Sequence, residues 1–545
     1  MGTSYLGGGA ASVLQVQTII SGGTGAGCTS PPPSGWAYTV PISREFSALA
    51  TNPSTGLTLM FGGQSWNQGT TLGDTWEYQS GCWTQISGES GWTPCGYQTP
   101  SATYDVATGC SGGGYSFEPL ARFSASMVWD PSLGTSGVFL LVGGCTTAYS
   151  SSYPDLCSST ATNTVLSDVW AFTPGGTFGT GSWSLVSTAT CSGGYPYGSA
   201  DDYIATGGSY YYWYKNCQYQ WSGGTTYDAP TYYCATTAAD NQCVGFGQYG
   251  GSMVYDPDHT QCSSSSACVL LYGGADYWSS HASTGYFGPC TSTDYIWETN
   301  TPDVGNYCTD ALWELVGNSL ATLGWWEMNP GVTWNTTSTA DSIGYKAYTW
   351  LLIQGEPIQY ARGEGLAYAK LNAPGCTSSA CTLVLTGGTR SSVGLNTGEV
   401  SIATTWYITG SVNETGGGTN GAWTQAAATT SFPAAEAAME AYDQIPAGSG
   451  AGQDTTLHNQ LVYMVGQSVA GGSESTPIST TTYSVWYISV TPGSGIGTWS
   501  YETLSPPPDD LFGAAAFYDG SLQFVVAFGG WDLTLNEPAS QYTLV

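Results

Sequence analysis

The sequence predicts an all-β protein built from six copies of one strand unit, and two observations carry this prediction. The first is a short apolar strand closed by a glycine pair, which recurs along the chain. The copies are LTLMFGG (57–63), VFLLVGG (138–144), VLLYGG (269–274), LVLTGG (383–388), LVYMVGQ (461–467) and FVVAFGG (524–530). The second is length, because 545 residues exceed one ordinary core and suit several domains or a repeat that adds cores unit by unit. The recurrence favours the repeat.

Each glycine pair lies between a strand of small residues and two strands that contain tryptophan. FSALATN is an example of the strand before the pair, and GDTWEY and GCWTQIS are examples of the strands after it. We place the first tryptophan of the units at Trp76, Trp170, Trp297, Trp406 and Trp486, and the second at Trp83, Trp183, Trp313, Trp423 and Trp499. Four strands with the smallest residues innermost suit a propeller blade, because innermost strands converge on a narrow channel.

These residues resemble the kelch-repeat β-propeller family. The shared features are the glycine pair that ends the second strand, the D-x-W entry to the third strand (GDTW, SDVW) and the tryptophan that opens the fourth. The resemblance covers the chain from about Trp36 to the C-terminus. Two departures are visible: the fifth unit has Gly466-Gln467 in place of the glycine pair, and the units are longer than the roughly 50 residues of a kelch repeat.

The sixth unit ends at SQYTLV without a second tryptophan, whereas SGWAYTVP (34–41) near the N-terminus matches GSWSLVS. We therefore expect a six-bladed kelch-like β-propeller whose last blade is closed by this N-terminal strand, which removes two exposed edges. The expected domains are a single propeller over residues 31–545 and an N-terminal extension over residues 1–30 that holds one spare strand.

The long insertions fall on one expected face of the propeller. Links between strands two and three, and from strand four to the next blade, leave a blade at the same end. The insertions are 87–121, 187–248 and 317–361 between blades, and 145–166, 275–293 and 468–483 within blades. Loops on a rigid scaffold commonly carry function, so this elaborated face is the expected binding face.

Composition limits the classes of partner. Charged residues are 8% of the chain, and 7 Lys+Arg against 38 Asp+Glu give a formal net charge of −31. Such a surface cannot neutralise a row of phosphates, which excludes nucleic acid and anionic membrane as partners. Few ion pairs would break on acidification, so we expect an extracellular or cell-surface protein of an acidic environment. No apolar run approaches a membrane span of ~20 residues, and the first twenty residues lack a signal-peptide pattern.

The sixteen cysteines indicate disulfide bonds, because they are even in number and lie mostly in Gly/Ser-rich stretches. Two close pairs, Cys262/Cys268 and Cys376/Cys381, each close a small loop before a repeat strand. Zinc is the competing interpretation, but the chain has three histidines and no CxxC, so we expect no metal and no cofactor. Sequons at Asn335 and Asn413 fit a secreted glycoprotein.

Three of the four arginines, Arg44, Arg122 and Arg362, align at or near the start of the first strand of a unit. We expect them to converge at the channel mouth, near Glu45, Glu364, Glu436 and Asp509. A cluster of guanidinium groups could bind a carboxylate or sulfate with paired hydrogen bonds. The alternative is that these arginines tie blades together, as often happens at this position in kelch blades.

Aromatic residues concentrate in two stretches of the elaborated face. GSYYYWYKNCQYQW (208–221) supplies the candidate binding residues Tyr211, Tyr212, Trp213 and Trp221, and GWW (324–326) supplies Trp325 and Trp326. Tyrosine and tryptophan offer flat apolar faces with polar edges, which suit stacking on sugars or burial in a protein interface. The alternative is that they form small cores beneath loops held by disulfides.

Catalysis has little support in the sequence. Copper radical oxidases similar to galactose oxidase need histidines that meet at one metal, whereas His259 and His458 map to one expected face and His281 to the other. We therefore expect a non-enzymatic extracellular binding or surface-structural protein, serving adhesion, a surface layer or a filament. It would recognise glycans or protein partners, and could self-associate through the N-terminal extension. The alternative is a secreted glycan-active enzyme with carboxylates at the channel mouth.

Overall fold

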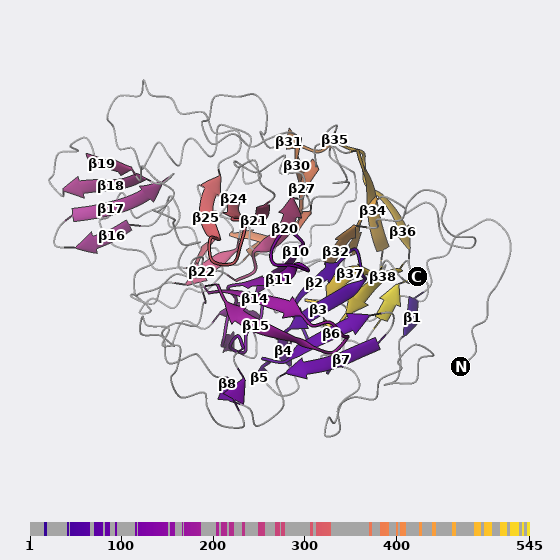
Figure 1. The fold of residues 1–545 in the computed structure, drawn as a ribbon. Coiled ribbons are helices and arrows are strands. Elements are labelled where there is room, and N and C mark those ends of the chain that lie inside the picture. The colour runs from indigo at the N-terminus through magenta and orange to yellow at the C-terminus, as the bar shows by residue number, and fades with distance from the viewer. Residues whose placement is uncertain are drawn as a thin grey trace.

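The computed structural model describes the protein in segments. These are residues 16–18, 41–42, 44–65, 70–79, 82–87, 93–94, 115–116, 118–150, 153–157, 166, 168–186, 203–206, 209–214, 217–222, 231–234, 249–256, 268–272, 274–277, 306–308, 312–328, 370–372, 382–387, 389–391, 399–401, 404–409, 424–427, 439–442, 460–464, 484–491, 495–503, 513–519, 524–532, 537–538 and 542–544. Within them every regular element is a strand, and no helix occurs (Figure 1). The expected all-β class is confirmed for this part of the chain.

Six sheets share one antiparallel pattern in which each strand pairs with its predecessor. In the order of pairing, sheet 1 consists of β2 (Ala48–Asn52), β3 (Leu57–Phe61), β6 (Thr75–Gln79) and β7 (Cys82–Ser87), and sheet 2 of β10 (Ser126–Asp130), β11 (Val138–Val142), β14 (Val169–Pro174) and β15 (Gly181–Leu185). Sheet 3 consists of β20 (Ser252–Asp256), β21 (Cys268–Tyr272), β24 (Leu312–Val316) and β25 (Gly324–Met328), and sheet 4 of β26 (Lys370–Asn372), β27 (Thr382–Thr386), β30 (Thr405–Thr409) and β31 (Thr424–Gln425). Sheet 5 consists of β32 (Met439–Tyr442), β33 (Gln460–Met464), β34 (Ser484–Thr491) and β36 (Ser500–Thr503), and sheet 6 of β37 (Ala515–Asp519), β38 (Phe524–Phe528), β41 (Tyr542–Leu544) and β1 (Val16–Thr18). The short strand β35 (Gly495–Ile496) also pairs with β34.

The first strands of the six sheets contact one another in sequence order. β2 contacts β10, β10 contacts β20, β20 contacts β26, β26 contacts β32, and β32 contacts β37. β37 in turn contacts β2, so the order of contacts returns to its starting point. Each first strand therefore has a first strand of another sheet on either side.

The hydrophobic core lies between neighbouring sheets. Residues of β11 alternate in the sheet that they face, as residues of a strand must: Phe139 and Leu141 pack with sheet 1, whereas Leu140 and Val142 pack with sheet 3. This burial on both faces explains why the second strand of each unit is a continuous apolar run. Further clusters join sheet 6 to sheet 1 through Phe528 and sheet 4 to sheet 5 through Val384.

The glycine pair serves close approach of neighbouring sheets. Gly62 has φ +65°, and a Cβ there would lie 2.3 Å from the carbonyl oxygen of Arg122 in the next sheet. Gly529 repeats this geometry at φ +77°, with a Cβ 2.1 Å from the carbonyl oxygen of Arg44. The following glycines, Gly63 and Gly530, donate their N–H groups to these same carbonyls. Only glycine fits, because the conformation is left-handed and the space is taken by backbone.

The closing strand of the sixth sheet differs from the expected one. β1 pairs with β41 in the register Val16 to Leu544 and Thr18 to Tyr542. The strand in the N-terminal extension is thus not spare, and in Figure 1 it lies beside the C-terminal strands. The expected closing strand, residues 34–41, lies outside the described residues except for Pro41. By register, Val16 occupies the place that Trp83 has in sheet 1.

The third sheet also differs from the sequence assignment. Trp313 lies in β24, which is the third strand and not the fourth, and β25 supplies the fourth strand with Trp325 and Trp326. Trp297, the expected third-strand tryptophan, lies outside the described residues. Leu315 pairs with Trp325 as Phe172 pairs with Trp183 in sheet 2, so Trp325 stands at the position of the fourth-strand tryptophan.

The links that carry additional strands leave the six sheets from one end, which we call the diglycine end because most of the second strands finish there with the glycine pair. The expected insertion 317–361 departs from this, because residues 317–323 link β24 to β25 at the opposite end, and Trp325 and Trp326 lie in a strand of sheet 3 and not in an insertion. Small two-stranded sheets follow the second strand in sheets 1, 2, 3, 4 and 6. They are β4 (Gln64–Ser65) with β5 (Thr70–Thr71), β12 (Ala148–Ser150) with β13 (Tyr153–Cys157), β22 (Ala275–Tyr277) with β23 (Asn306–Cys308), β28 (Thr389–Ser391) with β29 (Glu399–Ser401), and β39 (Trp531–Asp532) with β40 (Glu537–Pro538). After sheet 1 come the parallel strands β8 (Thr93–Pro94) and β9 (Tyr115–Ser116).

A further four-stranded sheet, the insert sheet, lies between sheets 2 and 3 in sequence. Its strands are β16 (Tyr203–Thr206), β17 (Ser209–Tyr214), β18 (Cys217–Ser222) and β19 (Thr231–Cys234). They pair in sequence order, and Figure 1 shows them as a sheet of their own.

Candidate functional site

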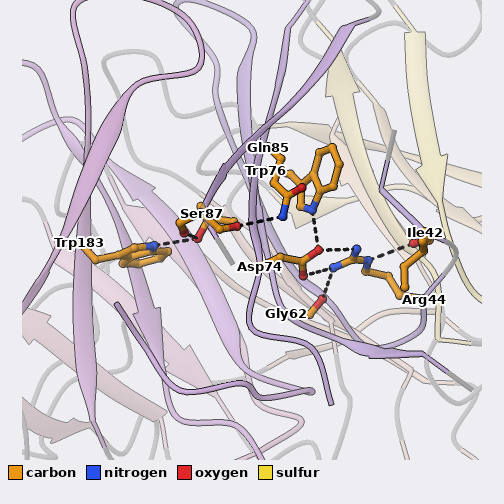
Figure 2. A network of polar contacts seen from close by, with 9 residues as sticks. Ile42, Arg44, Gly62, Asp74, Trp76, Gln85, Ser87 and Trp183 are labelled. Atoms are coloured by element: carbon orange, nitrogen blue, oxygen red, sulfur yellow. Dashed lines mark hydrogen bonds and ion pairs between the residues drawn. The ribbon is translucent and has the colours of Figure 1, made fainter. Parts of the chain in front are cut away.

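Arg44 lies at the diglycine end, directly before the first strand of sheet 1. Its Nη1 and Nη2 donate to the two carboxylate oxygens of Asp74 at 2.5 and 2.8 Å (Figure 2). Nη1 also donates to the carbonyl of Gly62, and Nε donates to the carbonyl of Ile42. The Trp76 indole N–H donates to Asp74 at 2.6 Å, so the D-x-W motif positions a carboxylate between an arginine and a tryptophan.

Arg122 repeats this arrangement in sheet 2. Its guanidinium donates to both oxygens of Asp168, at 2.5 and 2.8 Å, and to the carbonyl of Gly143. The Trp170 indole donates to Asp168 at 2.7 Å. The side chains of both partners are 0% exposed here, whereas Asp74 in sheet 1 is 13% exposed.

Electrostatics explain how a carboxylate is kept charged in such a site. Burial by itself raises the pKa of Asp74, but the charge of Arg44 and the hydrogen bonds from Arg44 and Trp76 lower it more. The net result is a pKa below the usual aspartate value. Because each guanidinium is buried and occupied by a carboxylate, neither Arg44 nor Arg122 has surface on which to hold an external anion.

The strand registers locate the equivalent positions in the other sheets. In sheets 1 and 2 the arginine lies four residues before the first residue of the first strand, and the aspartate lies directly before the third strand. The same offsets fall on Gln248 and Ala311 in sheet 3, Leu366 and Thr404 in sheet 4, Ala435 and Ser484 in sheet 5, and Leu511 and Ser540 in sheet 6. At these sequence offsets, arginine and aspartate are thus both present in sheets 1 and 2, and neither residue type is found at the same offsets in sheets 3 to 6.

This joint occurrence favours a structural role for Arg44 and Arg122 over ligand binding. Each guanidinium holds the aspartate of its own sheet, and the two arginines bond to the neighbouring sheet through backbone groups, as where their carbonyls accept from Gly530 and Gly63. An arginine kept for an external anion would not need an aspartate at a fixed offset in its own sheet. The third expected member, Arg362, lies outside the described residues. Glu45 beside Arg44 is 1% exposed, and Glu364, Glu436 and Asp509 also lie outside the described residues.

A chain of backbone hydrogen bonds runs through this end from sheet to sheet. Phe46 N–H donates to the carbonyl of Gly513, Ser124 N–H to that of Phe46, and Gly250 N–H to that of Ser124. These four residues stand at equivalent positions, two residues before the first strand, and all have φ between 51° and 74°. Phe46 and Ser124 adopt the left-handed region despite having a Cβ, which only strong constraint from the surroundings sustains.

Two indole N–H groups cross from one sheet to the next. Trp183 of sheet 2 donates to the hydroxyl of Thr75 in sheet 1 at 2.9 Å (Figure 2), and Trp499 of sheet 5 donates to Thr405 in sheet 4 at 2.8 Å. By register, Thr75 and Thr405 are equivalent residues. In sheets 2 and 5, the tryptophan at the start of the fourth strand therefore forms a hydrogen bond to the preceding sheet.

Glu77 makes a second contact between sheets 1 and 2. Its Oε2 accepts the N–H of Gly179, in the turn between β14 and β15, at 2.7 Å. The side chain is buried, and Oε1 has no hydrogen-bond partner. Burial raises the pKa of Glu77 to about 7. The hydrogen bond from Gly179 by itself lowers the pKa, but its effect is smaller than that of burial. This carboxyl is thus protonated in acid and ionised in weak base.

The candidate aromatic residues of 208–221 fall on opposite faces of the insert sheet. Tyr212 pairs with Tyr203 in β16 and with Tyr219 in β18, and Tyr219 pairs with Tyr232 in β19. Residues paired in register share a face, so one row of tyrosines crosses all four strands. The sequence had suggested Tyr212 but not its three partners in the row.

The remaining candidates separate by the same registers. Trp221 pairs with Tyr210, two residues from Tyr212, and belongs to the face of the tyrosine row. Tyr211 and Trp213 belong to the other face, together with Tyr233. Only strand alternation distinguishes the two sets, and that signal is present in SYYYWY once the strand is known.

Some of the cysteines lie in the described residues, whereas both expected glycosylation sites lie outside them. Cys82, Cys145 and Cys268 are disulfide-bonded, and no described cysteine is free. The expected partner of Cys268, Cys262, lies outside the described residues. So do Cys376, Cys381, Asn335, Asn413 and the three histidines.

No family model and no curated protein matches this chain. Within the segments that the model describes, no helix is both long and apolar enough to cross a membrane. In the same segments no three His, Cys, Asp or Glu residues lie together in a way that could hold a metal ion.

Proposed function

We propose that the six sheets are blades of a closed, six-bladed, kelch-like β-propeller. The returning order of contacts among the first strands supports this, as does the completion of sheet 6 by a strand from the N-terminus. The kelch-like character is supported by the hydrogen bonds from tryptophan to aspartate within the D-x-W motifs of sheets 1 and 2, and by the repeated close approach at Gly62 and Gly529. A ring of this kind leaves no sheet edge open between first and last blade.

On this scaffold the protein acts as a non-enzymatic extracellular binding or surface-structural protein. One observation carries the proposal: the small two-stranded sheets and the insert sheet all belong to links at the diglycine end. At the opposite end the links of sheets 1 and 2 are short, as between Asn52 and Leu57, and the longer links there, as between Tyr442 and Gln460, contain no described strand. Concentrated elaboration at one end of a rigid scaffold is typical of a recognition surface, here for glycans or protein partners.

An extracellular or cell-surface location in an acidic environment belongs to the same proposal. The disulfide-bonded Cys82, Cys145 and Cys268 favour an oxidising compartment. Glu77, which prefers to be neutral, and the scarcity of ion pairs favour acid. Peptide mapping without reduction should find a Cys262–Cys268 link and no free thiols, whereas several free thiols would contradict secretion by an oxidising route.

Closure is tested by truncation. Deleting residues 1–20 removes β1 and leaves β41 as an open edge, so we expect a lower melting temperature and concentration-dependent aggregation. Deleting residues 1–14 keeps β1 and is the matched control. If both truncated proteins melt and elute as the full chain does, closure by β1 is wrong. If deletion of residues 31–40 alone opens the edge, the strand at 34–41 closes the ring instead.

Recognition is tested by removing one insertion. Replacing residues 188–247 with a short Gly/Ser linker removes the insert sheet and should leave the melting temperature close to that of the parent. Binding is measured for both proteins on a glycan array and against extracts of surface proteins. We expect the replacement to lose binding partners that the parent retains. Identical binding profiles would show that this insertion takes no part in recognition.

A further inference from the structure

Glu77 places a carboxyl group in the contact between sheets 1 and 2. The residue is 1% exposed, and strand alternation puts it on the face of β6 that also carries Thr75, the acceptor of the Trp183 indole of sheet 2. Its partners across sheet 1 are Leu59 in β3 and Thr84 in β7. The carboxyl group is therefore enclosed by uncharged side chains of its own sheet and by sheet 2.

No cation compensates this carboxyl group within the described residues. The elements around it are β2, β3 and β7 of sheet 1 and β11, β14, β15 and the turn 175–180 of sheet 2. None of them contains a charged residue, a histidine or a tyrosine, and Cys82 of β7 is disulfide-bonded. Tyr78 faces sheet 6, and Asp130 of β10 lies on the side of Val128, which packs with sheet 3.

The two carboxyl oxygens of Glu77 have different surroundings. Oε2 accepts the N–H of Gly179, in the turn between β14 and β15, at 2.7 Å. Oε1 is buried and has no hydrogen-bond partner. The proton of the neutral acid therefore resides on Oε1, and its loss leaves a buried carboxylate that is held by one backbone N–H.

The turn 175–180 has little else to hold it on sheet 1. Its other hydrogen bonds are internal, between Gly175 and Thr180 and between Thr177 and Thr180. Most of its residues are exposed, whereas a Cβ at Gly179 would lie 2.9 Å from Thr84 Cγ2. The turn thus packs closely on sheet 1 at Gly179, where Glu77 supplies the polar contact.

We propose that the contact between Glu77 and this turn is a pH switch. While the carboxyl group is protonated, the turn stays packed on sheet 1. When the proton passes to solvent, the buried carboxylate lacks a cation, and the contact opens to let water reach it. The Gly179 N–H binds the carboxylate more strongly than the neutral acid, but one donor does not replace the hydration of an ion. The inference goes beyond the proposed function and does not depend on any ligand.

Linkage gives the direction and the range of the switch. Burial raises the pKa of Glu77 to about 7 in the closed contact, whereas a hydrated carboxyl keeps the ordinary pKa of 4.5. The ratio of open to closed contact therefore rises about ten-fold per pH unit between these two values and is constant above the higher one. The contact is firmest in acid and loosens toward neutral pH.

The other sheets offer an internal comparison. By register, the place of Glu77 is taken by Glu314 in sheet 3 and by Tyr407 in sheet 4. Glu314 is 0% exposed, so a buried carboxyl recurs at this position. In sheet 4 the glycine turn of the next sheet, at Gly495, faces Tyr407 and no carboxyl. The turn at Gly495 should therefore lack the switch.

Hydrogen exchange of the full-length protein tests the proposal. Mass spectrometry follows peptides that cover residues 174–182 and, as the internal control, residues 491–499 between pH 5 and pH 8. Each rate is corrected for the intrinsic pH dependence of amide exchange, so the remaining change reports opening. The proteins compared are the parent, Glu77→Gln, which keeps the acceptor oxygen but cannot ionise, and Glu77→Leu, which removes both acceptor and charge.

We expect protection of residues 174–182 in the parent to fall by about ten-fold or more between pH 5 and pH 7 and then to level off. In Glu77→Gln the protection should stay high over the whole range. In Glu77→Leu it should be lower than in the parent at pH 5 and should not change with pH. Protection of residues 491–499 should be the same at every pH in all three proteins.

The inference is wrong if protection of residues 174–182 in the parent does not change between pH 5 and pH 7, or if Glu77→Gln shows the same fall. A parallel fall at residues 491–499 would assign the effect to unfolding of the whole protein. A fall with pH in Glu77→Leu would assign it to another titrating group. None of these results bears on the proposed function, whose truncation and binding tests do not involve Glu77.

Discussion

The contact between sheets 1 and 2 and the contact between sheets 4 and 5 are two versions of one interface. Both contain an indole that donates to a threonine hydroxyl, Trp183 to Thr75 in one and Trp499 to Thr405 in the other. Both also contain a glycine turn that packs on the preceding sheet. Gly179 faces Thr84 and donates its N–H to Glu77, and Gly495 faces Tyr407.

The difference between them lies in charge. Sheets 1 and 2 each bury an Arg–Asp pair, whereas in sheet 4 Trp406 donates to Thr404 at the place of the aspartate. At the place of Glu77, sheet 4 has Tyr407. The neutral interface keeps the same tryptophan and glycine geometry. The comparison teaches that the Trp–Thr hydrogen bond and the glycine turn are the shared elements, and that buried charge is an addition to them.

The largest expected effect comes from breaking a buried pair. Asp168→Ala leaves Arg122 charged, buried and unpaired, which typically costs about 3–5 kcal/mol of unfolding free energy. Replacing both residues, as Arg122→Met with Asp168→Leu, should cost much less, because sheet 4 has Thr404 at the place of the aspartate and Trp406 still donates a hydrogen bond to it. Chemical denaturation measures the free energy of unfolding of both variants.

Arg122→Ala should lower stability and leave ligand binding unchanged. The opposite pattern would restore the arginine as a binding residue.

The next effect is the pH dependence of Glu77. Its pKa rises from 4.5 in the unfolded chain to about 7 in the folded protein, so the native state holds a proton that the unfolded state has released. Stability from this group therefore falls as pH rises from 4.5 to 7, by about 3 kcal/mol at about 1.36 kcal/mol per pKa unit. Glu77→Gln should remove this dependence and be more stable than the parent above pH 7. Parallel stability curves for both proteins would contradict the buried-carboxyl assignment.

A smaller effect should be equal in the two interfaces. Thr75→Val and Thr405→Val each leave a buried indole N–H without its acceptor, which costs about 1–2 kcal/mol. Thr58→Val is a control of similar burial whose hydroxyl pairs with Thr51 within sheet 1. If only Thr75→Val is destabilising, the Trp–Thr hydrogen bond is not a shared element of the interfaces.

The smallest effect separates the two glycine turns. Gly179→Ala and Gly495→Ala both place a Cβ at positive φ, which costs about 1 kcal/mol. The added Cβ at Gly179 would lie 2.9 Å from Thr84 Cγ2, whereas at Gly495 it would lie 3.4 Å from Tyr407. Thermal melts should therefore rank Gly179→Ala as the more damaging change. Gly176→Ala, with nothing within 4 Å, is the control.

Much of this strand arrangement is readable from local sequence. The second strands are continuous apolar runs because both faces are buried. The glycine pair marks the end of strand two, and the D-x-W motif marks the start of strand three. The alignment of Arg44 with Arg122 holds because both sheets have the same spacing to the first strand. The placing of Arg362 in the same group stays a prediction, because Arg362 lies outside the described residues and sheet 4 lacks the Asp-Pro turn that anchored the alignment.

The remaining differences come from partners that are distant in sequence. Trp36 matches the repeat pattern, but the strand that pairs with β41 is β1. Trp297 also matches the pattern, but the third strand of sheet 3, which pairs with β21, is β24. Val16 stands where a tryptophan was expected, so no motif identifies β1. The aromatic content of 208–221 was evident, but its division into two faces needs the register that only pairing supplies.

The pairing of β1 with β41 gives the chain a timing constraint. Val16 is synthesised long before its partner Leu544, because the two residues lie far apart in sequence. Sheets 1 to 5 pair strands that are near in sequence and can form while the chain is emerging, but sheet 6 cannot be completed until β41 has been synthesised. For any protein that crosses a membrane before folding, such a delay is an advantage, since sheet 6 cannot be completed until both β1 and β41 have been delivered.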